Sequence, residues 1–277
     1  MEILKSKEFL AEKTTFNLIT LIMNSENPEY LTDNKTYLIC RSSNITPIWI
    51  WTSNDISEEK QEEVLEKLDT LLDDDKVLQV TSKEIIFKKI VDKYQEKITR
   101  GYFKEKDYYL HMVTYKCENP VLTKPIIGKK ERPTMDDLET LKLFKKHDYE
   151  DTLTEEYSSK VTDEHLLTKT LKHINDPNFY VWKVNERIVA TASYVEEAEE
   201  ARISCVFTNR DDRGNGYAGM LVYELCKEII KKGKIPVIYA DYDYLPSNKA
   251  YQKIGFKQVG DLYNVKIGNG DVNVIGR

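Results

Sequence analysis

A glycine-bearing turn between an apolar segment and a helix constrains the fold of this chain most. Residues 203–208 read Ile-Ser-Cys-Val-Phe-Thr, a composition that predicts a strand. Residues 213–218, Arg-Gly-Asn-Gly-Tyr-Ala, form a turn, and apolar residues then recur at helical spacing across 220–232. The first amides of a helix have no helical partners, and the helix dipole favours negative charge there. Because Gly214 and Gly216 let a bulky anion approach the backbone, the turn predicts a phosphate or pyrophosphate ligand.

The surrounding residues argue against two common nucleotide-binding patterns. Glycines stand at positions 214, 216 and 219, but Arg213 directly ahead of them is not typical of a dinucleotide-binding turn. No lysine followed by serine or threonine closes the turn, so it is not a P-loop.

Two motifs resemble the signatures of the GNAT acetyltransferase superfamily. Arg213, Gly216 and Ala218 give the pattern Arg-x-x-Gly-x-Ala, which resembles the acyl-CoA-binding motif of that family. Asn248 and Tyr251, followed by Gly-Phe at 255–256, resemble its second signature, Asn-x-x-Tyr-x-x-x-Gly-Phe. The motifs occur in the family's order, separated by one helix and one strand, and the resemblance covers about residues 126–270.

The resemblance implies an α+β fold with a mixed, mainly antiparallel central sheet flanked by helices. It also implies acetyl-CoA as co-substrate, with the pyrophosphate held by the turn amides and the pantetheine arm lying along the edge of the 203–208 strand. An extended ligand can bind such an edge through backbone hydrogen bonds, as an added strand does. The expected cofactor-binding residues are Val206, Phe207, Thr208, Arg213, Gly214, Asn215, Gly216, Tyr217, Ala218, Gly219 and Asn248. Asn248 is equally suited to capping a helix.

Tyr251 is the candidate general acid. It matches the tyrosine that protonates the departing thiolate in many relatives, although a tyrosine that only packs on the cofactor is the alternative. The attacking amine must also lose a proton, directly or through water. Glu199, Glu200 and Asp241 are the candidate bases, and we select Glu200; each is otherwise a solvated or strand-end carboxylate.

The cysteines and histidines predict neither a metal site nor a covalent intermediate. The four cysteines show no close pairing and no metal-ligand spacing, which fits a reducing cytoplasm. Cys205 falls within the predicted strand, where burial would leave its thiol inert. The four histidines are scattered. We therefore expect direct attack of the amine on the thioester in a ternary complex.

The composition of the chain limits which kinds of binding partner we expect. A net charge of −6 over 277 residues argues against nonspecific nucleic-acid binding and favours cationic small molecules. No long apolar run predicts a transmembrane helix, and the N-terminus lacks the apolar core of a signal peptide, so we expect a cytoplasmic protein without membrane partners. The segment 147–157 holds five carboxylates and two tyrosines, and it is either a cation-binding acceptor loop or a solvated charged loop.

Two domains are predicted. Residues 1–117 give a helix (8–24), a hairpin (37–41 and 47–52), a helix (57–72), a strand (77–80), a helix (82–97) and one or two strands (102–117). This order resembles a degenerate, cofactor-free N-terminal half of the tandem two-domain members of the superfamily. Residues 118–125, with two prolines, predict a linker, and 126–277 the acetyltransferase domain. Its strands are expected at 126–132, 179–184 and 188–195, and its first helices from 134 and from 162.

The expected function is acetyl transfer from acetyl-CoA to a primary amine of a small-molecule or peptide acceptor. Aminoacyl transfer from charged tRNA, which also uses paired domains of this shape, and a non-enzymatic CoA-binding or interaction module remain as alternatives. The sequence identifies neither the acceptor nor the oligomeric state.

Overall fold

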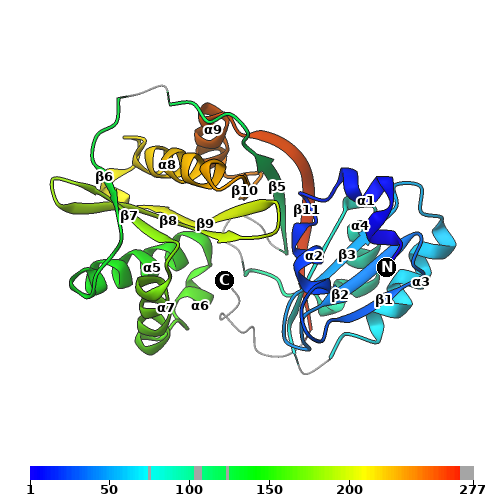
Figure 1. The fold of residues 1–277 in the computed structure, drawn as a ribbon. Coiled ribbons are helices and arrows are strands. Elements are labelled where there is room, and N and C mark those ends of the chain that lie inside the picture. The colour runs from blue at the N-terminus through cyan, green and yellow to red at the C-terminus, as the bar shows by residue number, and fades with distance from the viewer. Residues whose placement is uncertain (74–75, 103–107, 123–124, 269–277) are drawn as a thin grey trace. The chain divides into compact units, whose positions relative to one another are not determined.

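The computed structural model describes residues 1–73, 76–102, 108–122 and 125–268 (Figure 1). The chain separates into two compact units, Met1–Val113 together with the segment from Val259, and Thr114–Gln258. The predicted boundaries therefore shift at both ends of the second domain. The segment 118–122 belongs with the second unit, where Val121 N–H donates to the carbonyl of Ile254 at 2.7 Å. The C-terminal strand belongs with the first unit.

The first unit is built on a mixed sheet with strand order β1-β2-β3-β4-β11. The pairs β1–β2, β2–β3 and β4–β11 are antiparallel, whereas β3 and β4 run parallel. The strands are β1 (Glu29–Thr32), β2 (Tyr37–Arg41), β3 (Ile48–Thr52), β4 (Leu78–Ser82) and β11 (Lys257–Ile267). The predicted hairpin is confirmed as β2 and β3, and β1 is an element that we did not predict.

Four α-helices of the described chain lie in the first unit. They are α1 (Lys7–Ala11), α2 (Asn17–Met23), α3 (Glu58–Asp69) and α4 (Glu84–Tyr94). The single helix predicted over 8–24 is wrong, because the chain turns between α1 and α2. Thr15 lies in that turn and packs against β11 so closely that a Cβ on Gly260 would stand 2.1 Å from its Oγ1. A tertiary contact thus replaces the continuous helix that the apolar pattern indicated.

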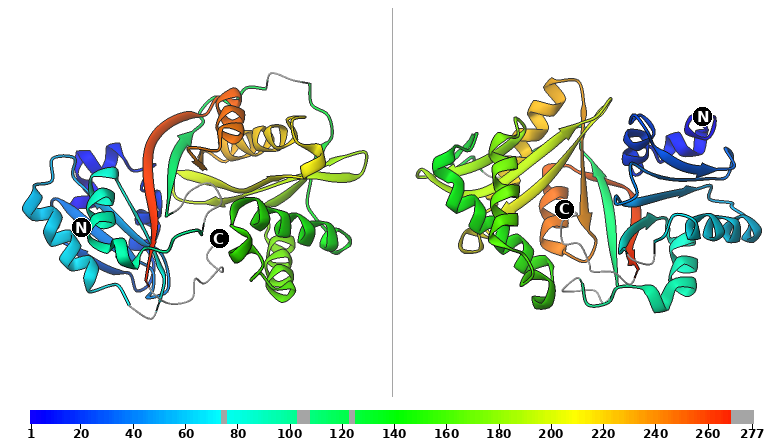
Figure 2. Two further views of the ribbon diagram at one scale, coloured as in Figure 1. Left: turned by 180° about the vertical axis from the view of Figure 1, so that it is seen from behind. Right: turned by 90° about the horizontal axis from the view of Figure 1, so that it is seen from below.

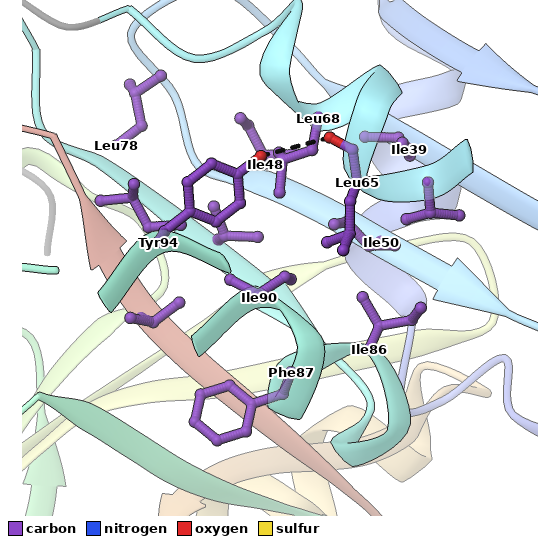
Figure 3. Packing of buried hydrophobic residues seen from close by; sticks show 14 of the residues in the cluster. Ile39, Ile48, Ile50, Leu65, Leu68, Leu78, Ile86, Phe87, Ile90 and Tyr94 are labelled. Atoms are coloured by element: carbon purple, nitrogen blue, oxygen red, sulfur yellow. Dashed lines mark hydrogen bonds between the residues drawn. The ribbon is translucent and has the colours of Figure 1, made fainter. Parts of the chain in front are cut away.

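The core of the first unit explains why the C-terminal strand joins it (Figure 3). Side chains from the sheet meet the inward faces of α3 and α4, and Tyr94 donates to the carbonyl of Leu65 at 3.3 Å and to Asp69 at 2.6 Å. β11 contributes Val265 and Ile267, each about 1% exposed. β11 buries its apolar side chains in the first unit, although the predicted domain 126–277 assigned this strand to the second. The cluster includes Ile39, Ile48, Ile50, Leu65, Leu68, Leu78, Val80, Ile86, Phe87 and Ile90.

The second unit holds the sheet that carries the predicted motifs. Its strands run in the order β10-β9-β8-β7-β6, antiparallel from β6 to β9 and parallel between β9 and β10. They are β6 (Lys129–Glu131), β7 (Phe179–Val184), β8 (Arg187–Glu196), β9 (Glu200–Thr208) and β10 (Ile235–Asp241), and the end of β5 (Tyr109–Lys116) belongs to the same unit. The sheet is mixed and mainly antiparallel, so the α+β class is confirmed.

Helices cover both faces of this sheet (Figures 1 and 2). One face carries α5 (Leu138–Thr152), α6 (Glu155–Ser158) and α7 (Asp163–Asn175), and the other carries α8 (Tyr217–Lys231) and α9 (Leu245–Ile254). Their starts follow the predicted caps. Thr134 and Asp137 form a capping box ahead of α5, and the Thr162 side chain accepts a hydrogen bond from His165 N–H at the start of α7.

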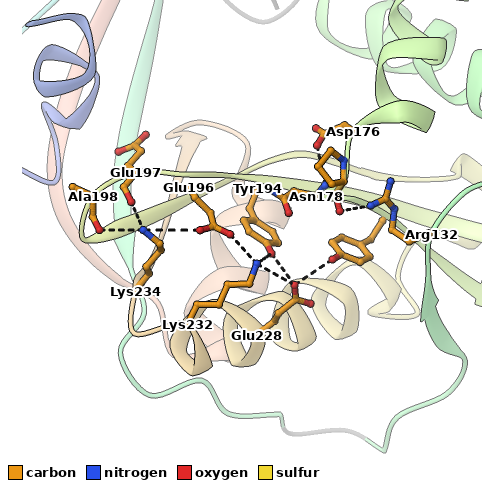
Figure 4. Close-up of polar contacts among 12 residues, drawn as sticks. Arg132, Asp176, Asn178, Tyr194, Glu196, Glu197, Ala198, Glu228, Lys232 and Lys234 are labelled. Atoms are coloured by element: carbon orange, nitrogen blue, oxygen red, sulfur yellow. Dashed lines mark hydrogen bonds and ion pairs between the residues drawn. The ribbon is translucent and has the colours of Figure 1, made fainter. Parts of the chain in front are cut away.

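The C-terminal end of α8 is tied to the sheet by a polar network (Figure 4). Glu228 accepts hydrogen bonds from the hydroxyls of Tyr194 at 2.7 Å and Tyr180 at 3.2 Å, and it forms an ion pair with Lys130. Lys232 joins Tyr194 to Glu196 at 2.6 and 2.7 Å. These bonds fix the end of α8 opposite to the glycine turn. Over the described ranges, no helix is both long and apolar enough to cross a membrane.

Candidate active site

The glycine turn has the backbone geometry expected of an anion site. Gly214 and Gly216 both have left-handed φ values, 82° and 85°, and Gly216 caps the N-terminus of α8. The first helical hydrogen bond runs from Met220 N–H to the carbonyl of Gly216 at 3.0 Å, so the amides before Met220 have no helical acceptor. A Cβ built on either glycine would meet nothing within 4 Å. The turn is therefore open to a ligand as well as rich in donors.

An aspartate that we did not predict holds this turn in place. Asp212 is 6% exposed and receives two hydrogen bonds from Arg187, at 2.8 and 2.6 Å, and a third from Asn209 at 2.6 Å. The Arg187 bonds, and after them the Asn209 bond, keep the pKa of this carboxyl below its usual value despite its burial. In the sequence, Asp212 is marked only by its position next to Arg213 of the motif. Its partner Arg187 lies on β8, far from it in the chain, so the sequence did not indicate the pair.

Arg213 is turned toward α5. Its guanidinium forms an ion pair with Asp151, donates to the carbonyl of Thr208 at 3.3 Å and lies 5.6 Å from the centre of the Phe207 ring. Arg210 binds the same carboxylate at 2.6 Å. Partial burial opposes the charge on Asp151, but the two arginines lower its pKa overall. The structure therefore gives Arg213 a role in joining α5 to the end of β9, and the backbone amides remain as the donors of the turn.

The strands β9 and β10 separate beside the turn. Their parallel register runs from the pair Glu200–Ile235 to the pair Ile203–Ile238 and stops there. β9 continues to Thr208, still paired with β8 on its other edge. The edge of residues 204–208 that faces β10 is thus outside the ladder. This is the edge along which Val206, Phe207 and Thr208 were expected to meet the pantetheine arm.

A β-bulge in β9 lies at the same place. The register with β8 shifts between the pairs Thr191–Phe207 and Ser193–Ser204, so Cys205 and Val206 together face the single residue Ala192, and β9 has one extra residue. Cys205 has a φ of 52°, which is unusual for a residue other than glycine. The Thr191 hydroxyl donates to the carbonyl of Cys205 at 3.0 Å. Bulges of this kind redirect side chains at functional sites.

The bulge overturns the prediction that Cys205 is buried. Its side chain is exposed, and its Sγ lies 3.7 Å from Nε2 of His173 on α7. The other three cysteines, at 40, 117 and 226, are buried free thiols.

Tyr251 and Asn248 lie on α9, beyond the C-terminal end of β10. Tyr251 is 7% exposed, in edge contact with the rings of Tyr115 at 6.5 Å and Phe256 at 5.9 Å. Burial raises its pKa, so the phenol keeps its proton at neutral pH. The Asn248 side chain donates to the carbonyls of Asp241, Tyr242 and Tyr244 at 2.7, 3.0 and 3.2 Å and accepts from Tyr115 at 3.1 Å. These bonds favour the structural alternative for Asn248.

Glu200, the selected candidate base, lies far from the glycine turn and the bulge of β9. It begins β9 opposite Ile235, whereas the bulge and the turn lie at the far end of the strand. Eight residues separate it from Thr208, which at about 3.3 Å per residue is roughly 26 Å. Glu199 precedes it, and its carbonyl accepts from Ile235 N–H at 3.0 Å. Of the three candidate bases, only Asp241 ends a strand on the separated side.

The acidic segment 147–157 is not a loop. It forms the end of α5 and the short α6, and four of its five carboxylates pair with cations of the same unit. Asp148 pairs with Lys145 at 2.9 Å, Glu150 with Arg210 at 3.0 Å and Glu156 with Lys160 at 3.3 Å. Together with the Asp151 pairs, these contacts favour a structural role over capture of a cationic substrate. Within the described part of the chain, no group of three or more His, Cys, Asp or Glu side chains could hold a metal ion.

Comparison with known proteins agrees with this geometry. The model of the "Acetyltransferase (GNAT) family" matches residues 145–256. Comparison with curated proteins found no match. Among solved structures, an acetyltransferase of the GNAT family from Colwellia psychrerythraea is 11% identical, with a TM-score of 0.54 over 92% of this chain and 89% of that one. A GCN5-related N-acetyltransferase from Kribbella flavida is 10% identical, with a TM-score of 0.59 over 96% and 98%.

A third solved structure, a functionally unknown conserved protein from Staphylococcus epidermidis, is 11% identical, with a TM-score of 0.58 over 89% of this chain and 96% of that one. At such identities the likeness shows the fold. The family match, in contrast, covers the bulge, the glycine turn, α8, β10 and Tyr251 together. Residues 145–256 therefore match the GNAT acetyltransferase family, and the chain shares its fold with these solved structures.

Proposed function

We propose that this protein transfers an acetyl group from acetyl-CoA to a primary amine of a small-molecule or peptide acceptor. The observation that carries the proposal is the open glycine turn at the N-terminus of α8, next to the separated edge of β9. A helix N-terminus with free amides suits a pyrophosphate. An unpaired strand edge suits an extended amide-containing arm. The two features adjoin, as one ligand with both groups requires.

The roles divide between the turn and the strand. The amides of residues 214–219 hold the pyrophosphate, and the β9 edge at Val206 and Thr208 binds the arm. A backbone N–H at the bulge stabilises the oxyanion that develops on the thioester carbonyl. Tyr251 protonates the departing thiolate of CoA. Asp241, which ends β10 on the separated side, replaces Glu200 as the candidate base.

The first unit is proposed to be a degenerate relative that binds no CoA. Its mixed sheet includes β11, which pairs with β4. A stoichiometry of one acetyl-CoA per chain follows from this proposal.

Calorimetric titration of the full chain tests the proposal first. We expect one acetyl-CoA to bind per chain, and a panel of polyamines, amino acids, aminoglycosides and peptides should then reveal CoA release that depends on an acceptor. Binding of acetyl-CoA without turnover on any amine would favour a CoA-binding module. Transfer from charged tRNA without binding of acetyl-CoA would favour the aminoacyl transferase. Two acetyl-CoA molecules per chain would refute the cofactor-free first unit.

A further inference from the structure

A row of three partly buried side chains on α7 runs from α5 to the bulge of β9. His165, Lys169 and His173 are spaced by four residues, so each lies about 6 Å further along the same face of the helix. At one end of the row, Nε2 of His165 is 3.0 Å from the hydroxyl of Tyr149 on α5. At the other end, Nε2 of His173 is 3.7 Å from Sγ of Cys205 in the bulge. Lys169 therefore lies between α5 and the segment of β9 where the thioester is proposed to bind.

Lys145 of α5 brings a second lysine to this region. Its side chain is only 12% exposed, and its ammonium group is 2.9 Å from Asp148. The same ammonium lies 4.7 Å from the centre of the ring of Tyr149, the residue that contacts His165 of the row. Asp148 thus serves as a counterion for Lys145, and the row on α7 faces a buried positive charge.

The charges that act on Lys169 include two other lysines. Burial lowers the pKa of Lys169 most, Lys145 and Lys172 lower it further, and Cys205 acts in the opposite direction. Burial and then Lys145 lower the pKa of His173 to about 4, so this ring is neutral at pH 7. An anion beside Lys169 would offset the repulsion among the lysines, whereas a further cation would increase it.

We propose that Lys169 selects the acceptor: the acetylated amine belongs to a molecule that also carries a carboxylate or a phosphate, and Lys169 binds that anionic group. This inference rests on the proposed function, which puts the thioester beside the bulge of β9. A lysine ammonium offers three donors and a full charge, and it binds either kind of anion.

The same positive charges act on the amine that attacks the thioester. Nearby positive charge lowers the pKa of an ammonium group, so a larger share of the acceptor is the neutral amine that can attack. Acceptors with several ammonium groups are disfavoured for the same reason. The net charge of −6 favoured cationic partners, but that count covers the whole chain, whereas the acceptor meets the charges close to the thioester.

Matched pairs of acceptors test the proposal with the full chain and saturating acetyl-CoA. Phenylalanine is compared with phenylalaninamide, and glucosamine 6-phosphate with glucosamine, while spermidine and kanamycin represent amines with several positive charges. The rate of CoA release gives kcat/KM for each compound, expressed per neutral amine because the amines differ in pKa. We expect the anion-bearing member of at least one pair to be better by about tenfold or more. The two pairs distinguish a carboxylate from a phosphate.

Variants of Lys169 assign the preference to this side chain. Lys169→Gln should raise KM for the preferred anion-bearing acceptor about tenfold, with kcat and the KM of the matched compound without the anion within a few-fold of wild type. Lys169→Arg keeps the charge and should restore most of the affinity. Lys146→Gln is the matched control, because it removes one positive charge from α5 at a side chain that is 59% exposed. Both glutamine variants should bind acetyl-CoA as the wild type does, and thermal unfolding checks that they are folded.

The outcomes separate this inference from the proposed function. If amines without an anion are acetylated as well as their anion-bearing counterparts, or if Lys169→Gln leaves the KM of the preferred acceptor unchanged, the role of Lys169 is refuted while acetyl transfer stands. Preference for spermidine or kanamycin would likewise refute it. If no amine is acetylated, the proposed function fails, and this inference fails with it.

Discussion

Replacement of Gly216 by alanine separates ligand binding from backbone strain. Gly216 has a φ of 85° at the N-cap of α8, and a Cβ there would meet no atom within 4 Å. The alanine therefore causes no clash within the protein, and its cost comes from the left-handed conformation, about 1–2 kcal/mol. We expect the unfolding midpoint to fall by a few degrees. The methyl group also stands where the pyrophosphate approaches the turn amides.

The loss of affinity can be worked from the donors that the methyl group displaces. Hydrogen bonds to a charged acceptor contribute about 1.5–3 kcal/mol each. Displacement of the phosphate from one amide should therefore weaken acetyl-CoA binding about tenfold to a hundredfold. Isothermal titration calorimetry measures this change directly, and thermal unfolding without ligand measures the strain in the same variant.

The chain offers a matched control at the other end of the same helix. Gly233 has a φ of 76°, and its Cβ would also meet nothing within 4 Å. It follows α8, so at about 1.5 Å per residue it lies roughly 22 Å or more from the turn. Gly233→Ala should lower stability by a similar amount and leave acetyl-CoA affinity unchanged. Equal affinities of the two variants for acetyl-CoA would refute the assignment of the pyrophosphate to this turn.

Two further perturbations address the proton donor and the support of the turn. Tyr251→Phe removes a hydroxyl but keeps the ring packing, so acetyl-CoA affinity should hold within a few-fold while turnover drops by about 10²–10⁴; full turnover would leave Tyr251 as a packing residue. Asp212→Asn removes the charge that pairs with Arg187, whose side chain is partly exposed. We therefore expect the free energy of unfolding to fall by about 1 kcal/mol and acetyl-CoA binding to weaken. Because the folded pKa of Asp212 is lowered, the advantage of the wild type should be complete above the unfolded pKa of about 4 and vanish as pH falls through the lower folded pKa. Urea unfolding of both proteins as a function of pH measures this difference, and a difference that grows as pH falls would contradict the assignment.

Local signals predicted the second unit well. Apolar and β-branched composition predicted the 203–208 part of β9, a glycine turn predicted the start of α8, and Thr caps with acidic residues predicted where α5 and α7 begin. These features depend on neighbouring residues, because backbone conformation and capping are decided within one or two turns. The two family motifs added the α+β class and the order of the strands.

Elements that depend on distant partners were predicted poorly. The apolar residues of 8–24 fit one helix, but the packing of Thr15 against Gly260 splits it. The strand β11 reads as the end of the second domain, yet it pairs with β4 and buries Val265 and Ile267 in the first unit. A strand needs a partner ladder, and its own sequence does not say which of two sheets supplies it.

The same distinction between local and long-range signals applies to the candidate site. The sequence by itself predicted the glycine turn and singled out Tyr251 as a candidate residue. Both signals depend only on residues close together in the chain, namely the glycines of a left-handed turn and the spacing of a motif. Only the tertiary structure decided that Arg213 binds Asp151, that Glu200 lies at the far end of β9 and that a bulge exposes Cys205 beside His173. A one-residue shift in register reverses which face a side chain occupies, and that shift is set by pairing with β8 across the sheet.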